Sequence, residues 1–480
     1  MSAAAPDSRF SAAALTEMIE ALGPGGALTD PADVAPYVVD FRALYHGRTP
    51  LVARPDSVAR VQSLVAIAAR HRIGIVPQGG NTSYCGGATP DEHGGQIVLS
   101  LARLNRVRSV DAAGYSMVVD AGCTLARVQQ AAADADRLFP LSLGSEGTCQ
   151  IGGNLATNAG GTAVLRYGMI RDLVLGLEVI LADGRRLDQL KCLRKDNTGY
   201  DVKQLFLGAE GTLGVITGAC LKLFPLPAAQ LTAFVAVDGM AAAVALLSRV
   251  RAQFGDAVTA FEYVPYAAYE MAQRRLPGVA RPIADPYPGY VLLELGLARA
   301  AEAEGEALER FLSEALARDE LKDAVLARSA RERDALWYLR SHIPEAQKRE
   351  GASLKHDISL PIAGLAAFVR EAESALAQLA PVGRLVAYGH LGDGNLHFNL
   401  SPAPGASDAE LLALTEPVKR LVHDLVAAHG GSFSAEHGVG QLKVAELARY
   451  EDPVALELMR TVKRALDPQG IMNPGKVIAP

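Results

Sequence analysis

The chain has 480 residues, of which 49% are hydrophobic and 21% are charged, and its formal net charge is −6. These values are typical of a globular protein with two or three domains, and they give no electrostatic basis for binding nucleic acid or an anionic membrane. No apolar run reaches the length of a membrane span. The N-terminal stretch predicts a helix with interspersed acidic residues rather than a signal or transit peptide. Five scattered cysteines without a C-x-x-C pair predict reduced thiols and a cytoplasmic location.

The first half of the chain predicts short helices and strands in alternation. A helical pattern and a loop up to residue 50 precede a helix over residues 54–72, which begins at an N-cap formed by Asp56 or Ser57. Five strands are predicted, the last two joined by an Asp-Gly hairpin turn, at residues 73–76, 96–101, 117–122, 177–181 and 185–187.

Three glycine-rich, weakly charged segments interrupt these elements, at residues 77–87, 143–161 and 208–216. Glycine allows backbone N–H groups to approach phosphates closely. The first segment matches neither the Rossmann fingerprint nor the P-loop, and by itself it is explained equally well as an ordinary surface loop. Three such segments within about 180 residues indicate one extended, phosphate-containing cofactor.

The composition changes at residues 224–227, FPLP, where we expect a domain boundary. The βαβ-βα order that follows is typical of a ferredoxin-like half, and a Pro-rich loop is expected at residues 276–288. The elements predicted in this part are strands at 231–237, 261–264 and 290–296 and helices at 240–254, 301–317, 411–428 and 453–466.

Residues 387–400, AYGHLGDGNLHFNL, predict a β-hairpin whose loop is Gly392–Asn395. With this loop, His390 lies opposite His397, and directly opposed Cβ atoms are about 5 Å apart on one face. Glu436, in SAEHGVG, is a candidate third ligand. Two His and one carboxylate leave open positions on a divalent metal, and zinc, manganese and cobalt all remain candidates. The alternative is two unrelated histidines in a glycine-rich turn.

Several motifs together resemble a known family. PQGGNTSYCGG, LGSEGTCQIGGNLATNAGG, LRYGMIRD, DNTGYD and GAEGTLGVIT resemble the flavin-binding half of the vanillyl-alcohol-oxidase superfamily. GHLGDGNLHFN, SAEHGVG and LDPQGIMNPGKV resemble its D-2-hydroxyacid dehydrogenase branch, which includes D-lactate, glycolate and D-2-hydroxyglutarate enzymes. The similarity runs in order from about residue 45 to the C-terminus and is greatest to the D-2-hydroxyglutarate dehydrogenases.

The resemblance implies an α+β fold with a two-part FAD-binding domain, a ferredoxin-like substrate domain and a C-terminal helical segment. The expected parts are an N-terminal helical segment (1–45), the FAD-binding domain (46–225), the substrate domain with the hairpin (226–425) and a segment returning to the flavin (426–480). Some relatives tether FAD through a His in the first glycine segment, and because Gly79, Gly80 and Asn81 offer no such nucleophile, FAD is expected to bind non-covalently. The residues implied to bind FAD are Pro77, Gly79, Gly80, Asn81, Thr82, Ser83, Gly86, Gly87, Gly144, Ser145, Gly147, Thr148, Gly152, Gly153, Asn154, Thr157, Asn158, Gly160, Gly161, Gly211, Val215, Ile216 and Asn473.

The chemistry of this branch needs a base, since flavin takes the hydride from C2 while the hydroxyl proton leaves. His437, next to Glu436, is the candidate base, and the alternative is a structural histidine in a tight loop. A metal at His390, His397 and Glu436 would orient the hydroxyl and one carboxylate oxygen of the substrate.

Three further residues are candidate substrate ligands. The resemblance implies Arg340 and Lys355 as carboxylate clamps, and Asn399 is expected on the same strand face as His397. Two positions depart from the D-2-hydroxyglutarate pattern, because Pro344 stands where a Thr is expected and His356 where a Tyr is expected. These departures leave open the length of the acid that the distal pocket accepts.

The leading hypothesis is an FAD- and metal-dependent dehydrogenase that oxidises D-2-hydroxyglutarate or a similar D-2-hydroxy dicarboxylate. A D-lactate or glycolate dehydrogenase of the same family is the first alternative. A non-flavin zinc hydrolase and a non-catalytic flavin-binding protein are more remote ones. The expected partners are a small hydroxyacid and an unidentified electron acceptor, which is an electron-transfer flavoprotein, a cytochrome or a quinone. A homodimer is one oligomeric state that the sequence leaves open.

Overall fold

A computed structural model of the chain describes residues 10–298 and 302–479. The described residues form two compact units. Unit 1 comprises residues 10–161, 168–226 and 436–479, and unit 2 comprises residues 162–167, 227–298 and 302–435. The four-part functional division expected from the sequence stays a prediction.

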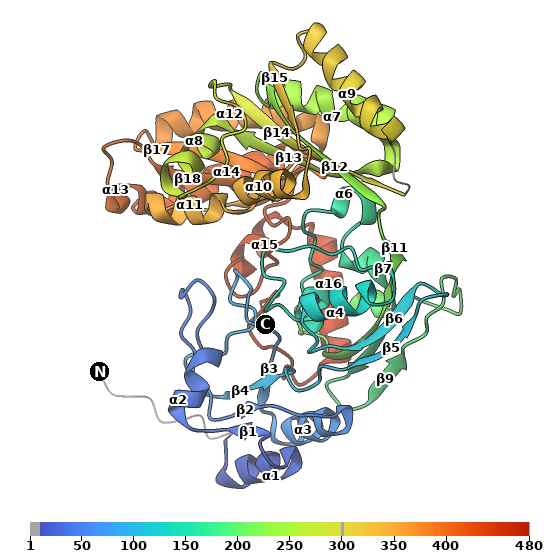
Figure 1. The fold of residues 1–480 in the computed structure, drawn as a ribbon. Helices are drawn as coiled ribbons and strands as arrows, with labels where there is room; N and C mark the ends of the chain where they lie inside the picture. The colour runs from blue at the N-terminus through green and yellow to red at the C-terminus, as the bar shows by residue number, and fades with distance from the viewer. Residues whose placement is uncertain (1–9, 299–301, 480) are drawn as a thin grey trace. The chain divides into compact units, whose positions relative to one another are not determined.

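Unit 1 contains two sheets of different kinds, together with a two-stranded ribbon of β7 and β11 (Figure 1). In the four-stranded sheet, of order β1-β2-β4-β3, β4 pairs in parallel with both of its neighbours. The five-stranded sheet, of order β5-β6-β10-β8-β9, is antiparallel throughout. The strands are β1 (Ala27–Leu28), β2 (Val52–Ala53), β3 (Gly74–Gln78), β4 (Gln96–Ser100), β5 (Val107–Asp111), β6 (Ser116–Asp120), β7 (Arg137–Leu138), β8 (Val174–Ile180), β9 (Arg186–Gln189), β10 (Val215–Lys222) and β11 (Phe224–Pro225).

The helices of unit 1 are short, apart from three of eleven or more residues. The α-helices are α1 (Ala12–Leu22), α2 (Pro31–Val34), α3 (Val58–His71), α4 (Leu125–Ala133), α5 (Ile151–Ala156), α15 (Val444–Tyr450) and α16 (Pro453–Leu466), and the 3-10 turns are η1 (Ala35–Tyr37), η2 (Ile170–Leu173) and η3 (Val202–Leu205). Ser57 caps α3 by accepting a hydrogen bond from the backbone N–H of Arg60, so one of the two predicted caps is confirmed. The residues of the predicted N-terminal helix before residue 10 lie outside the described part of the chain.

The expectation of five reduced thiols is wrong for one pair of cysteines. Cys192 and Cys220 form a disulfide with a Cα–Cα distance of 5.9 Å, whereas Cys85, Cys123 and Cys149 are buried thiols outside any disulfide of the described residues. Cys220 lies in β10, and Cys192 follows β9. Both strands pair with β8, so the sheet brings together two cysteines whose sequence spacing gave no signal.

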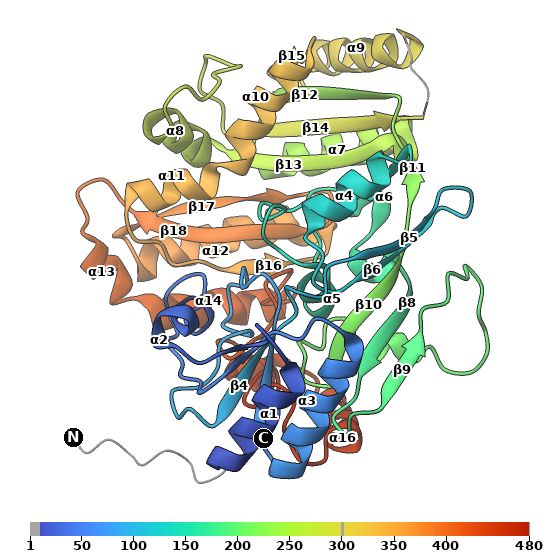
Figure 2. The same ribbon diagram turned by 60° about the horizontal axis from the view of Figure 1, so that its bottom comes forward.

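Unit 2 is built on one seven-stranded antiparallel sheet, of order β15-β12-β14-β13-β17-β18-β16. Figure 2 shows β14, β13, β17 and β18 lying side by side. The strands are β12 (Ala229–Val237), β13 (Val258–Pro265), β14 (Gly289–Leu297), β15 (Asp323–Leu326), β16 (Asp357–Ser359), β17 (Gly383–His390) and β18 (Asn395–Pro402). The helices are α6 (Val164–Tyr167), α7 (Met240–Phe254), α8 (Tyr266–Arg275), α9 (Glu302–Ala317), α10 (Ala330–Ser341), α11 (Ile343–Glu350), α12 (Leu365–Leu379), α13 (Asp408–Leu412) and α14 (Thr415–Ala428), with 3-10 turns η4 (Gly255–Ala257) and η5 (Ile362–Gly364).

The first four strands of this sheet have the ferredoxin-like order. Taken in chain order, β12, β13, β14 and β15 are arranged 4-1-3-2, and α7 and α9 form the two crossovers. The predicted α+β class, with its ferredoxin-like half, is therefore confirmed. Beyond the prediction, β13 also pairs with β17 through Glu262 opposite His390 and Tyr263 opposite Gly389. This pairing extends the same sheet to the hairpin.

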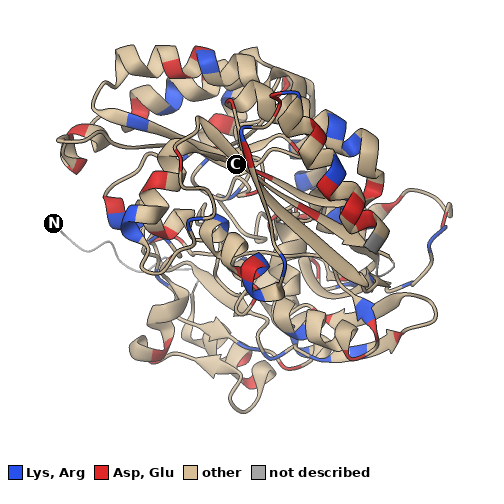
Figure 3. Cartoon of the chain, turned by 45° about the horizontal axis from the view of Figure 1, so that its top comes forward, with Lys and Arg blue, Asp and Glu red and all other residues tan. Residues whose placement is uncertain are grey.

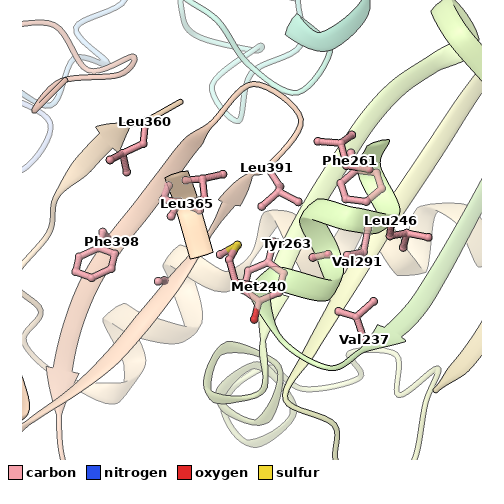
Figure 4. Close-up of a cluster of buried hydrophobic side chains, with 14 of the residues drawn as sticks. Val237, Met240, Leu246, Phe261, Tyr263, Val291, Leu360, Leu365, Leu391 and Phe398 are labelled. Carbon is pink, nitrogen blue, oxygen red and sulfur yellow. The ribbon is translucent and has the colours of Figure 1, made fainter. Parts of the chain in front are cut away.

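Side chains alternate between two apolar layers on the two faces of the sheet, as the period of a strand requires. One face packs against α7, α9, α12 and α14, and Figure 4 shows part of this layer around Phe261, Leu391 and Phe398. The other face packs against α8, α10 and α11 through residues such as Val264 and Leu339. We call the second face the α10 face. The polar candidates of unit 2 described below lie on it.

One predicted helix is divided in the structure. The helix expected over residues 411–428 consists of α13 and α14, which are separated at Ala413 and Leu414. Ser407 and Glu410 form a capping box that begins α13, and this local signal starts a separate short helix. The helices predicted at residues 240–254 and 453–466 are confirmed by α7 and α16, while residue 301 of another predicted helix lies outside the described residues.

Figure 3 shows basic and acidic residues interspersed along the helices, in keeping with the small net charge of the chain. Many of them pair with the opposite sign, as Arg274 and Arg275 do with Glu350. Within the described residues, no helix combines the length and apolar content that crossing a membrane requires.

Candidate active site

All of the residues predicted to bind FAD belong to unit 1. The first glycine segment leaves β3 at Gln78, whose side-chain amide donates to the carbonyls of Tyr37 (2.9 Å) and Ala88 (2.8 Å). Asn81 has a left-handed backbone conformation (φ 53°) and donates to the carbonyl of Val39 at 2.9 Å. Side-chain bonds to the backbone therefore fix the shape of this loop.

The first and second glycine segments lie directly against each other. A Cβ atom built on Gly80 would stand 2.1 Å from the carbonyl oxygen of Thr148, so only glycine permits this approach. A Cβ atom on Gly79 would stand 3.5 Å from the Cα atom of Gly153. The two segments, whose contacting residues Gly80 and Thr148 are 68 positions apart in the sequence, thus form one surface.

Asn473 joins the first and third segments from the C-terminal part of the chain. Its side-chain amide donates to the carbonyls of Gly87 (2.9 Å) and Glu210 (2.7 Å). Both Asn473 (φ 43°) and Glu210 (φ 50°) have left-handed backbones. Such conformations cost free energy and concentrate at functional sites, so this junction is a constrained part of unit 1.

These residues fit an extended polar ligand. Cβ atoms built on Gly144, Gly147 and Gly153 would meet nothing within 4 Å, so open space borders the second segment. Three buried side-chain oxygens make no hydrogen bond within the described residues, namely those of Gln150 and Asn154 in the second segment and that of Asn473. Buried acceptors are rarely left without a donor, and a ligand that carries hydroxyl and imide groups would supply donors.

The SAEHGVG segment is fastened to the same region of unit 1 from Glu436 onward. The carboxylate of Glu210 accepts from the backbone N–H groups of Val439 (2.7 Å) and Gly440 (2.8 Å). The ring of His437 lies 4.5 Å from that of Tyr84, which belongs to the first glycine segment. Burial raises the pKa of the Tyr84 hydroxyl, and the negative charge of Glu436 adds to this effect. The predicted base is thus held against the first glycine loop by residues that the sequence did not single out.

In unit 2, the predicted hairpin is present, but its predicted register is wrong. The loop is residues 391–394, and Tyr388, rather than His390, lies opposite His397. The reason is that Asn395 belongs to β18, where its side chain donates to Asp357 (3.0 Å). His390 is two residues from Tyr388 and so shares its face, and the rings of His390 and His397 are 5.5 Å apart. The two imidazoles therefore come together diagonally across the strands.

His390 takes part in a buried ionic network on the α10 face. Its Nδ1 atom lies 2.7 Å from Glu262, which also binds Arg340 at 2.6 Å and 2.8 Å. Burial alone would raise the pKa of Glu262, but the charge of the Arg340 guanidinium and the interaction with His390 lower that pKa to about 2. The sequence gave one signal for Glu262, a single carboxylate in the otherwise apolar strand FEYV.

The remaining candidates of unit 2 surround His397. Asp357 lies opposite His397 in the sheet, with a carboxylate oxygen 3.9 Å from its Nδ1 atom. The register that pairs Asp357 with His397 also places Lys355 opposite Asn399, and all four residues lie on the α10 face. Asn399 is buried and donates to Gln347 of α11 at 3.0 Å. Lys355, His397 and Asn399 thus share a face with Arg340 and His390.

The two departures from the family pattern have structural explanations. Pro344 lies in the first turn of α11, where a missing backbone N–H costs nothing. His356 points to the opposite face from Lys355, because its Nδ1 atom lies 2.9 Å from the carbonyl oxygen of Phe398 and its ring contacts that of His423 in α14. His356 therefore does not lie on the face that carries Lys355.

The comparisons with known proteins agree with this fold. Residues 226–477 match the C-terminal domain of FAD linked oxidases, and residues 49–188 match an FAD binding domain. The solved structure of p-cresol methylhydroxylase with substrate bound is similar with a TM-score of 0.76 at 17% identity, covering 97% of this chain and 96% of that one. That likeness shows the fold alone.

Two similar relatives are mitochondrial D-2-hydroxyglutarate dehydrogenases. The protein of Bos taurus is 40% identical over 465 residues, which cover 96% of this chain and 82% of that protein. The protein of Rattus norvegicus is 38% identical over 461 residues, which cover 96% of this chain and 84% of that protein. For this chain, the predicted cytoplasmic location stays a prediction.

The fold and the glycine-lined segments define an FAD-binding flavoprotein of the vanillyl-alcohol-oxidase type. More particularly, the chain belongs to the family of FAD linked oxidases. The alternative of a non-flavin zinc hydrolase is therefore wrong.

Proposed function

We propose that this flavoprotein is a dehydrogenase that oxidises D-2-hydroxyglutarate, or a similar D-2-hydroxy dicarboxylate, to the 2-oxoacid. The observation that carries the proposal is the set of groups on the α10 face of unit 2. Arg340 and Lys355 are cationic, Asn399 offers an amide, and His390 and His397 are 5.5 Å apart. The names of the most similar relatives support the same substrate class.

We also propose that unit 1 binds FAD non-covalently and that unit 2 binds the acid. The proposal is supported by the buried acceptors without donors in the glycine segments. The residues that would hold FAD are those predicted from the sequence, with Asn473 at the junction of the first and third segments. The electron acceptor would be an electron-transfer flavoprotein, a cytochrome or a quinone.

A divalent metal fits the two imidazoles of unit 2. His390 uses its Nδ1 atom toward Glu262, which leaves its Nε2 atom as a ligand atom. We propose Glu436 as the third ligand. Connectivity supports this choice, since the preceding residue, Ala435, donates from its backbone N–H to the carbonyl of Asp357, the residue opposite His397. Two His and one carboxylate suit zinc, manganese or cobalt.

Each side chain has a distinct proposed role in the reaction. When bound, FAD supplies the hydride acceptor and the divalent ion supplies positive charge at the substrate hydroxyl. Arg340, Lys355 and Asn399 bind carboxylate oxygens and thereby orient C2 of the acid. His437 removes the hydroxyl proton through a ring nitrogen, while Tyr84 holds its ring in place.

One observation favours the alternative of D-lactate or glycolate as substrate. Pro344 offers no side-chain donor at the position where the D-2-hydroxyglutarate pattern has a threonine. A substrate with one carboxylate would not need that donor.

Replacing Lys355 with alanine separates these two substrates. Lys355→Ala is expected to raise the KM for D-2-hydroxyglutarate about 10- to 100-fold, since a hydrogen bond to a charged group contributes about 1.5–3 kcal/mol. The KM for D-lactate should change much less, because lactate has no distal carboxylate. Steady-state kinetics with both acids measure the effect, and Lys348→Ala, at an exposed lysine of α11, is the control. An equal rise for both acids would reject Lys355 as the distal clamp.

Replacing Asn473 with alanine tests the FAD junction. Asn473→Ala removes two hydrogen bonds, worth about 1–3 kcal/mol together, so the Kd for FAD is expected to rise about tenfold or more. Titration of the deflavinated protein with FAD, followed by fluorescence quenching, measures the change. The control is Asn105→Ala, which removes an exposed bond to Ala102. Unchanged FAD affinity in the folded Asn473→Ala variant would contradict the assignment.

A further inference from the structure

Glu262 lies in the centre of the sheet of unit 2 and is 1% exposed. It belongs to β13, on the α10 face, and β13 lies between the neighbouring strands β14 and β17. A buried carboxylate must be compensated by positive charge and hydrogen bonds. Two residues with proposed roles in the reaction, Arg340 and His390, supply both.

The contacts assign one carboxylate oxygen to each partner. Oε1 lies 2.7 Å from Nδ1 of His390, whereas Oε2 lies 2.8 Å from Nε and 2.6 Å from Nη2 of Arg340. Arg340 is itself 5% exposed, and its guanidinium carbon lies 5.1 Å from the ring centre of Tyr388. The position of the guanidinium is thus fixed from two sides.

A purely structural role would be to attach α10 to the sheet, and Glu294 shows what that role requires. Glu294 lies on β14, on the same face and 7% exposed, and binds Trp337 of α10 at 2.7 Å and Thr232 at 3.0 Å. Trp337 and Arg340 are one turn apart on α10. Glu294 therefore attaches the same helix to the same sheet without touching a residue proposed to bind metal or substrate.

Glu262 differs from Glu294 because it constrains an imidazole. A carboxylate accepts only, so Nδ1 of His390 must carry the proton that lies between them. Nε2 then keeps its lone pair and is the atom that can bind a metal. The same carboxylate accepts a hydrogen bond from Nε of Arg340 and forms an ion pair with its Nη2 side, which leaves the rest of the guanidinium for a substrate carboxylate.

We propose that Glu262 is a positioning residue that fixes the tautomer of His390 and the plane of the Arg340 guanidinium, and so couples the metal ligand to the carboxylate clamp. This inference rests on the proposed function, because that function requires Arg340 and His390, and the inference assigns to Glu262 the role of positioning them. It predicts that the metal site and the substrate clamp weaken together when the carboxylate is removed.

The test compares Glu262→Gln, Glu262→Asp and the control Glu294→Gln in the full-length flavoprotein. Zinc affinity is measured by competition with a chromogenic chelator after the metal has been stripped, and FAD content is measured by absorbance. Glu262→Gln is expected to weaken zinc binding about 10- to 100-fold and to raise the KM for the hydroxyacid, with FAD content unchanged. Glu262→Asp should restore part of both, and Glu294→Gln should change neither. The proposal would be overturned if Glu262→Gln bound zinc as tightly as the wild type does. It would also be overturned if Glu294→Gln weakened zinc binding as much as Glu262→Gln does.

A second measurement needs no variant of Glu262 and no metal. Histidine-selective ¹⁵N NMR of the metal-free wild-type protein reports the tautomer of each of the ten histidines, and the signal of His390 is assigned by its loss in His390→Ala. A proton on Nδ1 supports the proposal, and a proton on Nε2 alone overturns it. If the tautomer is as expected but wild type and His390→Ala bind zinc equally, the proposed metal site fails while the positioning of His390 by Glu262 stands.

Discussion

Replacing His390 with alanine is expected to remove the divalent metal and to lower kcat/KM by about a thousandfold or more, while FAD remains bound. The reason is that the proposed site loses one of its two imidazoles, and a Lewis acid at the reacting oxygen is worth several kcal/mol of transition-state stabilisation. His390 belongs to unit 2, whereas the residues that would bind FAD belong to unit 1. The flavin spectrum should therefore be unchanged.

Metal content by atomic emission, flavin content by absorbance and turnover on the same sample measure these effects. The matched control is His429→Ala, which removes an imidazole paired with Glu371 at the surface of unit 2 and should leave all three values unchanged. Full turnover in His390→Ala without metal would contradict the metal site. Loss of FAD together with the metal would show that His390 supports the fold rather than the chemistry.

Replacing His437 with alanine is expected to slow flavin reduction at saturating substrate by about 10²- to 10⁴-fold, the usual contribution of a general base. Substrate binding should change little, because Arg340, Lys355 and Asn399 are intact. Anaerobic stopped-flow measurement of flavin bleaching gives the rate constant directly. Partial rescue by added imidazole would support proton removal at this position.

The control for this experiment is His71→Ala, which removes an imidazole paired with Glu17 at the surface of unit 1. Because His437 follows the proposed ligand Glu436, metal content is measured in the same samples. An unchanged reduction rate in His437→Ala with metal and FAD present would mean that another group takes the proton.

The fold could be predicted where the signals were local or repeated. The helix that Ser57 begins, five of the strands of unit 1 and the ferredoxin-like order of β12 to β15 follow from capping, periodicity and element order. The glycine segments were visible because their composition is unsuited to a core. That Asn473 belongs with these segments was predicted only from the family resemblance, because 263 residues separate Asn473 from Glu210.

The remaining features depend on pairings between distant parts of the chain. The register of the hairpin is set by Asn395, whose side chain binds Asp357 on a third strand, so the loop sequence alone gave the wrong partner for His397. The disulfide between Cys192 and Cys220 depends on two strands that both pair with β8. Glu262 is 128 residues from His390 and 78 residues from Arg340, and no spacing rule connects them.

The most direct measurement is anaerobic mixing of the purified protein with D-2-hydroxyglutarate, D-lactate, D-malate and glycolate in turn, with flavin bleaching followed before and after chelator treatment. The account predicts fast bleaching by D-2-hydroxyglutarate that disappears when the metal is removed and returns when zinc is added. Bleaching by D-lactate alone would favour the alternative substrate. Bleaching that is unaffected by the chelator would contradict the metal site, and no bleaching by any of the four acids would contradict the proposed function.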